Sequence, residues 1–160
     1  MDSLSYRPLL LKDLDAVQQL YLQALDAARD ALAKVRVNEK LFAHTMRQMR
    51  QELLAQQRYL AWVAEADGQI LGYIAAVIET QASLFEVSRY ANINEIFILP
   101  EYRRRGVGTG LVNCLQSQVD ALGLEWLCVQ FPKSAQGLEN FFNKLTFESQ
   151  AIEMRKRLGA

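Results

Sequence analysis

The chain has 160 residues, 51% of them apolar, and its 18 basic and 18 acidic side chains give a net charge of zero. This size predicts one domain, residues 1–160, with a single sizeable core. The balanced charge excludes a global field that would attract nucleic acid or an acidic membrane, so we expect neither as a partner.

Cysteine and histidine are too few for a disulfide framework or a metal site, since the sequence holds only Cys114, Cys128 and His44. We expect no metal, and reduced thiols in a cytoplasmic protein. The start, Met1-Asp2-Ser3, carries an acid and no apolar leader, and no run approaches 18 apolar residues. Both features predict a soluble protein that is not exported.

The first third of the chain predicts a strand and two helices. Tyr6 to Leu11 is expected to form the strand, and Asp13 to cap the helix that follows it. A second helix is expected after Asn38, with His44 exposed on its surface rather than acting as a base. The apolar positions of this second helix are Leu41, Phe42, Met46, Met49 and Leu53, at helical spacing.

A hairpin is predicted next. Tyr59 to Ala66 and Gln69 to Glu79 should pair antiparallel, because Asp67-Gly68 between them is a strong two-residue turn signal. Gly72 inside the second strand indicates a bulge or a close packing approach. Thr80 to Ala91 is polar, and we expect a surface loop there.

The most informative stretch is a strand followed by a basic, glycine-rich turn and a helix. Ile93 to Leu99 is rich in β-branched and aromatic residues, and Pro100 ends it. The helix is expected to begin near Gly106 and to end before Gly123. Its apolar stripe is Val107, Leu111, Leu115, Val119 and Leu122.

The rest of the chain predicts a strand from Glu125 to Phe131, a helix from Ala135 to Leu145, and one or two final strands from Phe147 to Leu158. The alternation of strands and helices favours a mixed sheet with helices on both faces. The residues of the last helix that are expected to face the core are Leu138, Phe141, Phe142 and Leu145.

The glycine-rich turn has the composition of a phosphate site. The first N–H groups of a helix have no intrahelical partner, and the helix dipole stabilises an anion there by ~0.3–1 kcal/mol. Arginines add charge, and glycines let a pyrophosphate approach the backbone. The alternative is an arginine-rich solvated turn. The candidate residues are Arg103, Arg104, Arg105, Gly106, Val107, Gly108, Thr109 and Gly110.

Two other phosphate loops are excluded by spacing. A dinucleotide fingerprint needs a third glycine where Leu111 stands, and a P-loop needs Gly-Lys-Ser/Thr, which is absent. The motif that remains, Arg103-Arg104-Arg105-Gly106-Val107-Gly108, resembles the Gln/Arg-x-x-Gly-x-Gly/Ala motif of the GNAT superfamily of acyl-CoA-dependent N-acyltransferases. The run from Ile96 to Arg103 is also similar to the family's strand and turn.

This resemblance implies a fold and a cosubstrate. The fold is α/β (α+β), with a mixed, mostly antiparallel sheet of six or seven strands flanked by helices and splayed between the central strand (about 92–99) and the next (about 125–131). The cosubstrate is acetyl-CoA. In the family its pantetheine arm bonds the strand backbone as an extra strand would, which implies contacts from Ile96, Phe97 and Ile98.

The same resemblance places the thioester near Glu95. An alkylammonium with a pKa of ~10.4 must lose a proton before it attacks, so a base is useful. Glu95 is the only carboxylate on the strand and is expected to be that base. The alternative is that Glu95 begins the strand and is solvated or salt-bridged.

The chain departs from the family pattern near its end. The pattern Tyr-x-x-x-Gly-Phe reads Phe142 to Phe147 here, so the tyrosine that often protonates the leaving thiolate is Phe142. The asparagine that often bonds the pantetheine arm is Ala135. Water, Ser134 or Tyr90 are the candidates to replace the missing acid.

The sequence therefore predicts an N-acetyltransferase that moves the acetyl group of acetyl-CoA to a primary amine of a small molecule or peptide, by direct attack in a ternary complex. Residues Ala27 to Val37 should border the acceptor pocket, and a homodimer is left open. A non-catalytic acyl-CoA-binding module is the alternative, favoured by Phe142 and Ala135. RNA binding by the arginines is disfavoured, because the neutral chain shows no extended basic face.

Overall fold

The computed structural model describes residues 3–31, 44, 47–51, 53, 55, 58–82, 87–131 and 135–150. Its contacts divide the chain into two compact units, Met1–Gln130 and Phe131–Ala160. The first unit holds the sheet and two long helices. The second holds one helix.

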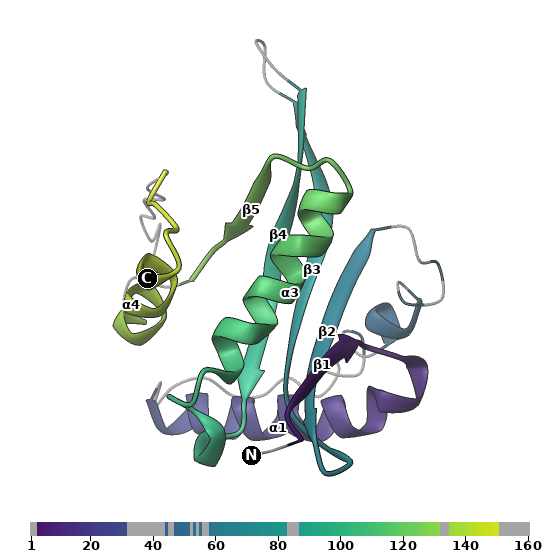
Figure 1. Cartoon of the computed structure of the whole chain (residues 1–160), viewed down its shortest axis with the longest axis vertical. Helices are drawn as coiled ribbons and strands as arrows, with labels where there is room; N and C mark the ends of the chain where they lie inside the picture. Colours follow the sequence, from purple (N-terminus) through teal and green to yellow (C-terminus); the bar gives the residue numbers. More distant parts are fainter. Residues whose placement is uncertain are drawn as a thin grey trace, which may run out of the picture. The chain divides into compact units, whose positions relative to one another are not determined.

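The sheet has five strands in the order β1-β2-β3-β4-β5, so neighbours in sequence are neighbours in space (Figure 1). The first four pair antiparallel, and β5 runs parallel to β4. This confirms the expected mixed, mostly antiparallel sheet with helices. The strands are β1 (Ser5–Pro8), β2 (Tyr59–Ala66), β3 (Gln69–Ala82), β4 (Val87–Ile98) and β5 (Trp126–Val129).

The expected count of six or seven strands is not matched, since the described residues form five. The extra strands were expected from Phe147 to Leu158, of which 151–158 lie outside the described residues and 147–150 are not strand. Phe147 donates its backbone N–H to the carbonyl of Phe142 over 3.1 Å, and their rings meet edge to face at 5.0 Å. This segment therefore closes the end of a helix instead of starting a strand.

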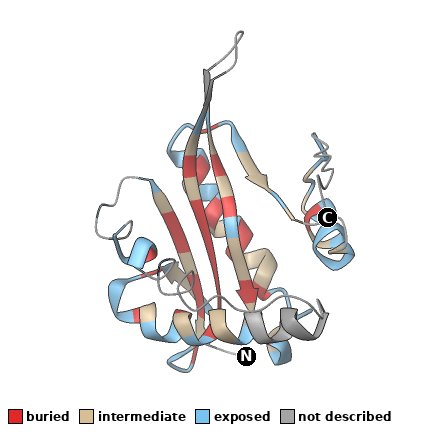
Figure 2. Cartoon of the chain, turned by 180° about the vertical axis from the view of Figure 1, so that it is seen from behind, coloured by how far each residue is buried: buried red, intermediate tan, exposed pale blue. Residues whose placement is uncertain are grey.

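The helical elements are η1 (Leu11–Asp13), α1 (Leu14–Ala31), η2 (Pro100–Tyr102), α3 (Val107–Ala121) and α4 (Gln136–Lys144). Helix α1 packs on one face of the sheet, where Val17 joins a core with Tyr73 and Phe97. Helix α3 packs on the other face, where the Nε1 of Trp62 donates to Oε1 of Gln118 over 2.7 Å. Figures 1 and 2 show the two helices on opposite sides of the strands. None of the helices in the described part is long and apolar enough to span a bilayer.

The hairpin of β2 and β3 is confirmed. Asp67 and Gly68 have φ of 51° and 76°, the paired positive values of a type I′ turn. Both readings of Gly72 hold as well. A bulge at Leu71 shifts the register beside it, and a Cβ on Gly72 would lie 2.6 Å from the carbonyl oxygen of Phe97.

The expected loop from Thr80 to Ala91 is wrong, because β3 runs to Ala82 and β4 starts at Val87. The two strands stay in register up to their ends, with Glu79 opposite Tyr90. This part of the ribbon is polar and projects beyond the core, so it lacks the hydrophobic alternation that marks a half-buried strand. Phe85, which was expected in that loop, lies outside the described residues.

The helix predictions hold with local exceptions. Helix α3 buries its predicted stripe except Leu122, which is 51% exposed because the helix has ended at Ala121. In α4, Phe142 is buried but Leu138 is exposed. Among the described residues of the second predicted helix, Met49 is buried in the core. The others behave as follows: His44 is exposed as expected, Leu53 packs against the core, and Leu41, Phe42 and Met46 lie outside the described residues.

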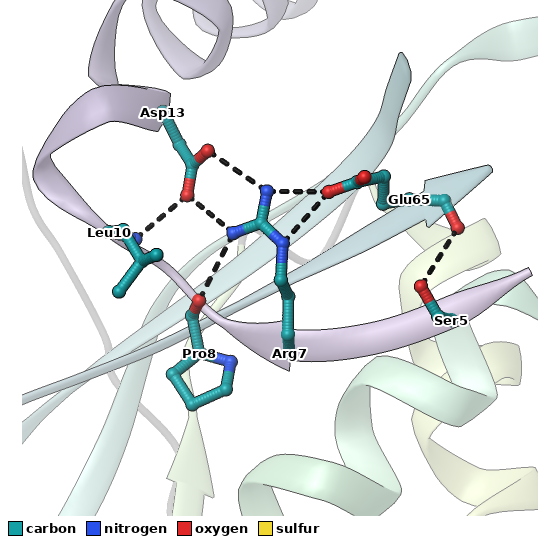
Figure 3. A network of polar contacts seen from close by, with 6 residues as sticks. All are labelled: Ser5, Arg7, Pro8, Leu10, Asp13 and Glu65. Carbon is teal, nitrogen blue, oxygen red and sulfur yellow. Dashed lines mark hydrogen bonds and ion pairs between the residues drawn. The ribbon is translucent and has the colours of Figure 1, made fainter. Parts of the chain in front are cut away.

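A polar network fixes the entry to α1 (Figure 3). The guanidinium of Arg7 donates to both carboxylate oxygens of Asp13, at 2.6 and 3.0 Å, and its Nε donates to Glu65 over 2.8 Å. Asp13, only 5% exposed, also accepts the N–H of Leu10 over 2.8 Å. Asp13 does stand immediately before α1, as expected of a cap, but these bonds turn its carboxylate back toward β1.

Candidate active site

A bulge in β4 decides which way Glu95 points. Ile93 pairs with Ala76 and Glu95 pairs with Ala75, so Asn94 is an extra residue with no partner on β3. Glu95 therefore lies on the face opposite Ile93, which is the face covered by α1.

Glu95 sits among phenols on that face. The hydroxyl of Tyr73, a residue that is 1% exposed, donates to Oε2 of Glu95 over 2.7 Å. Glu95 itself is half-buried, and burial raises the pKa of its carboxyl, although the hydrogen bond from Tyr73 acts in the opposite direction. Burial raises the pKa of Tyr21 on α1, and the charge of Glu95 raises it further.

The alternative reading of Glu95 is wrong in placing it at the start of the strand. Glu95 lies inside β4 rather than at its start, and it shares a face with Phe97, which pairs with Tyr73. In the described part of the chain its carboxylate accepts a neutral hydroxyl and forms no ion pair.

Beyond Ile93, one edge of β4 has no partner strand among the described residues, and we call it the open edge. Pairing with β5 runs from Tyr90 opposite Trp126 to Ile93 opposite Val129 and then stops. Residues 94–98 continue the strand with no described partner on that side. The predicted splay lies at this place and remains a prediction.

The backbone groups predicted to contact the pantetheine arm, those of Ile96, Phe97 and Ile98, do not all point to the same side of β4. The N–H of Leu99 donates to the carbonyl of Leu71 on β3, so by alternation Ile98 and Ile96 direct their backbone groups to the open edge, while Phe97 turns toward β3. The carbonyl of Ile98 already accepts Nε of Arg103 over 2.9 Å.

The turn between β4 and α3 is exposed from Arg103 to Gly106. Arg104 and Gly106 both have positive φ, 61° and 85°, which glycine adopts without strain and arginine does not. Arg103 lies over the Phe97 ring with its Cζ 5.5 Å from the centroid, and Arg105 lies over the ring of Tyr102 at 5.8 Å. Two of the three arginines therefore fold back onto the turn.

The start of α3 supplies free donors. The N–H of Gly110 donates to the carbonyl of Gly106 over 3.0 Å, the first i to i−4 bond of the helix. The N–H groups of Val107, Gly108 and Thr109 precede that bond and have no intrahelical acceptor. This is the donor arrangement that was predicted to hold a phosphate.

Gly110 has a packing reason that the sequence did not reveal. A Cβ at this position would lie 2.1 Å from Cζ of Tyr6, so the end of the half-buried Tyr6 ring on β1, which lies over Gly110, would have to turn aside. Gly106 has no atom within 4 Å of an added Cβ, and its glycine is required by the backbone alone.

A comparison with protein families matches residues 25–147 to the acetyltransferase (GNAT) family. The chain belongs to this family. The match covers the bulged strand, the glycine-rich turn and the start of α3, and it confirms the predicted membership of a family of acyltransferase enzymes.

Curated relatives of this GNAT chain match over part of their length. An uncharacterized N-acetyltransferase of Archaeoglobus fulgidus is 37% identical over 60 residues, 38% of this chain and 40% of the relative. The alignment thus spans well under half of that protein.

Solved structures share the fold across the chain. The structure of AAC(6')-Iy in complex with the bisubstrate analogue CoA-S-monomethyl-acetylneamine has a TM-score of 0.71 at 20% identity and covers 97% of this chain and 99% of that one. A predicted acetyltransferase of Clostridium acetobutylicum, determined with acetyl-CoA, has a TM-score of 0.77 at 18% identity and covers 96% of both chains. At this identity the likeness establishes the fold.

The residues proposed to protonate the leaving thiolate in this GNAT chain differ in how well their surroundings suit that role. The hydroxyl of Tyr90 donates to Oε2 of Glu79 over 2.8 Å, and that bond is the main cause of its raised pKa, which makes Tyr90 a weak acid. Ser134 lies outside the described residues, and Ala135 directly precedes α4. Phe142, in place of the tyrosine, is 2% exposed and stacks on Phe131 with ring centroids 5.9 Å apart.

Sequence reasoning missed Tyr73 and Tyr21 as neighbours of Glu95. Tyr21 appeared only as an apolar position of the first helix, and Tyr73 only as part of a strand. The single signal for Tyr73 was its place beside Gly72. Residues 32–37 of the predicted acceptor border lie outside the described residues, and Ala27 to Ala31 are the end of α1.

Proposed function

We propose that this chain is an N-acetyltransferase that moves the acetyl group of acetyl-CoA to a primary amine of a small molecule or peptide by direct attack in a ternary complex. The observation that carries the proposal is the open edge of β4, which leads from Glu95 to the free N–H groups of α3. Five residues separate Glu95 from Pro100, about 16 Å at the strand rise, comparable to an extended pantetheine arm. Acetyl-CoA and a coenzyme A analogue in structures of the same fold support the choice of donor.

The residues present fit such a donor. The N–H groups of Val107, Gly108 and Thr109 would bind the pyrophosphate, and the positive φ of Gly106 sets the turn that directs them outward. Arg104 and its neighbours add positive charge. The backbone groups of Ile96 and of its strand neighbours on the open edge would bind the pantetheine arm.

Glu95 would remove the proton from the acceptor. At pH 7 an amine with a pKa of ~10.4 is neutral about once in 2,500 molecules, a deficit of ~4.6 kcal/mol. Burial raises the pKa of the Glu95 carboxyl and so makes it a stronger base than a solvated carboxylate. The hydrogen bond from Tyr73 holds one oxygen and leaves Oε1 for the amine.

The transfer itself forms one bond and breaks another. The neutral amine attacks the thioester carbonyl carbon, the new C–N bond forms, the C–S bond breaks, and the excess proton on the attacking nitrogen is released to water. Coenzyme A leaves as a thiolate. Its thiol has a free pKa of ~8.5 by analogy with cysteine, so the thiolate is a good leaving group even without a strong acid. Backbone N–H groups on the open edge of β4 would polarise the carbonyl.

The test is release of free thiol from acetyl-CoA in the presence of a library of primary amines. Amine-dependent release, with the acetamide found by mass spectrometry, supports the enzyme. Saturable binding of acetyl-CoA without release from any amine supports the alternative, a non-catalytic acyl-CoA-binding module, which Phe142 and Ala135 favour. A chain that binds no acyl-CoA contradicts both.

A further inference from the structure

A second carboxylate, Glu79, lies on the same face of the sheet as Glu95. Glu79 pairs with Tyr90 and Ala75 pairs with Glu95, and directly paired residues of antiparallel strands project to one face. Four residues of β3 separate the two pairs, which is roughly 13 Å along the strand. The face therefore carries two acidic groups at a fixed spacing.

The polar partners of Glu79 are neutral. Its oxygens accept the hydroxyl of Tyr90 over 2.8 Å and the Nδ2 of Asn92 over 3.4 Å. In the described part of the chain no cation lies within ion-pair distance of this half-buried carboxylate. The negative charge is thus held in place by neutral donors without being compensated.

The amide of Asn92 has unused capacity on the same face. Its Oδ1 is buried and has no hydrogen-bond partner among the described residues. A buried acceptor without a partner is costly, and such groups in a native protein call for an explanation. One N–H of this amide donates to Glu79, and an N–H donor is the kind of group that would satisfy Oδ1.

An exposed indole lies on the same face, two strands from Glu79 and next to Tyr90. Trp126 of β5 pairs with Tyr90 and is 53% exposed, and parallel pairs share a face of the sheet. Cys128 pairs with Asn92 two residues later, and its pKa is raised first by burial and then by the charge of Glu79. Aromatic faces and a carboxylate together attract organic cations.

Figure 2 shows this face of the sheet from the side of α1. Helix α1 crosses the strands near one end, and no helix or strand of the described residues crosses β3 and β4 toward their hairpin on this side. Along β3, the Glu79–Tyr90 pair lies four positions nearer that hairpin than the Ala75–Glu95 pair.

We propose that Glu79, with Trp126 across Tyr90 on the same face, binds a second cationic group of the acceptor, so that the acceptor is a diamine or polyamine whose one amine reaches Glu95 while another binds at Glu79. This inference rests on the proposed acetyl transfer. It adds to that transfer a substrate class and a residue that selects it. The competing role for Glu79 is structural, as a brace between β3 and β4 through Tyr90 and Asn92.

The experiment compares linear α,ω-diamines of increasing length with monoalkylamines of matched length, and measures kcat and KM separately. We expect a preference for diamines above a threshold length. Glu79→Gln should raise KM for those diamines about tenfold, the size of one charge-assisted hydrogen bond, with kcat for monoamines unchanged. Asp120→Asn, which removes an exposed carboxylate from α3, is the matched control and should change neither.

The outcomes separate this inference from the proposed function. Equal use of diamines and monoamines by the wild type, or a Glu79→Gln variant that retains the diamine preference, overturns the inference and leaves acetyl transfer standing. Absence of thiol release with every amine, monoamines included, overturns both. If Glu79→Gln fails to fold, Trp126→Ala removes an exposed side chain instead, and its diamine preference should fall while monoamine rates stay the same. An unchanged preference in Trp126→Ala would then overturn the inference.

Discussion

Tyr73 donates its hydroxyl to Oε2 of Glu95 over 2.7 Å from a position that is 1% exposed. A buried phenol has few alternative partners, so the contact fixes one carboxylate oxygen and directs the other away from the core. It also moderates the effect of burial on the pKa of Glu95. The pair links the interior of the sheet to the place where we expect the amine.

Tyr73→Phe should shift the pH profile of the reaction. Burial already raises the pKa of Glu95, and the hydrogen bond from Tyr73 lowers it, so losing that bond raises the pKa further. Glu95 acts as a base when deprotonated, and the rising limb of kcat/KM should therefore move to higher pH by roughly one unit. The matched control is Tyr102→Phe, which keeps the ring beneath Arg105. An unmoved limb in Tyr73→Phe would show that Glu95 is not the titrating base.

Gly110→Ala should destabilise the fold. The added Cβ would lie 2.1 Å from Cζ of Tyr6, so the end of that half-buried ring must turn away from α3, and the lost packing should cost at most ~1–3 kcal/mol in the free energy of unfolding, measured by urea titration. Gly137→Ala in α4 is the control, because no atom lies within 4 Å of its Cβ and alanine favours a helix. Adding Tyr6→Ala to Gly110→Ala should relieve the clash. Equal stability of Gly110→Ala and Gly137→Ala would contradict the packing assigned to Tyr6.

Gly108→Val should abolish binding of acetyl-CoA while the fold is kept. The N–H of Gly108 is one of the free donors at the start of α3, and a branched side chain would fill the space that a pyrophosphate needs. Acetyl-CoA at a hundredfold excess over Kd should stabilise the wild type by about 2.7 kcal/mol, seen as a rise in Tm. The variant should show no such rise. A variant with wild-type affinity would make the glycine-rich segment a simple turn.

Asp13 should make folding sensitive to acid. Burial opposes the charged form, but the hydrogen bonds from Arg7 and from the N–H of Leu10, with the charge of Arg7, hold the pKa of Asp13 below its usual value. A lowered pKa in the folded state gives stability above the unfolded pKa of ~3.9, and this stability is lost as pH falls through the folded value. Asp13→Asn should cost ~1–3 kcal/mol in unfolding free energy at pH 7. The gap between variant and wild type should narrow below about pH 4, and a gap independent of pH would exclude the ion pair as its source.

Much of the fold could be predicted because local signals agreed with the tertiary structure. Asp67-Gly68 specified the first hairpin, and β2 has the predicted bounds, Tyr59–Ala66. Pro100 and Gly106 marked the turn before α3. The last three residues of β3 and the start of β4 up to Ala91 escaped prediction, because their mostly polar residues pair with each other rather than with the core.

The candidate site could be predicted in part, for a related reason. Glu95 was identifiable as the lone carboxylate of its strand, and Gly106 as part of a motif. The contact between Glu95 and Tyr73 depends on the register between β3 and β4. The bulge at Asn94 sets that register, and no local pattern reveals it. The sequence assigned Gly110 to the phosphate site. Its packing against Tyr6 could not be foreseen, because that contact joins residues that are distant in the sequence.

The most direct test of this account is amine-dependent release of coenzyme A thiol by the wild type and by Glu95→Gln, measured across pH on a verified acceptor. We predict that Glu95→Gln lowers kcat by ~10²–10⁴-fold below the pKa of the acceptor and leaves the affinity for acetyl-CoA unchanged. The deficit should shrink as pH approaches that pKa, because the amine then arrives already neutral. Wild-type turnover in Glu95→Gln at neutral pH would contradict the assignment of Glu95 as the base, and a wild type that releases no thiol with any amine would contradict acetyl transfer itself.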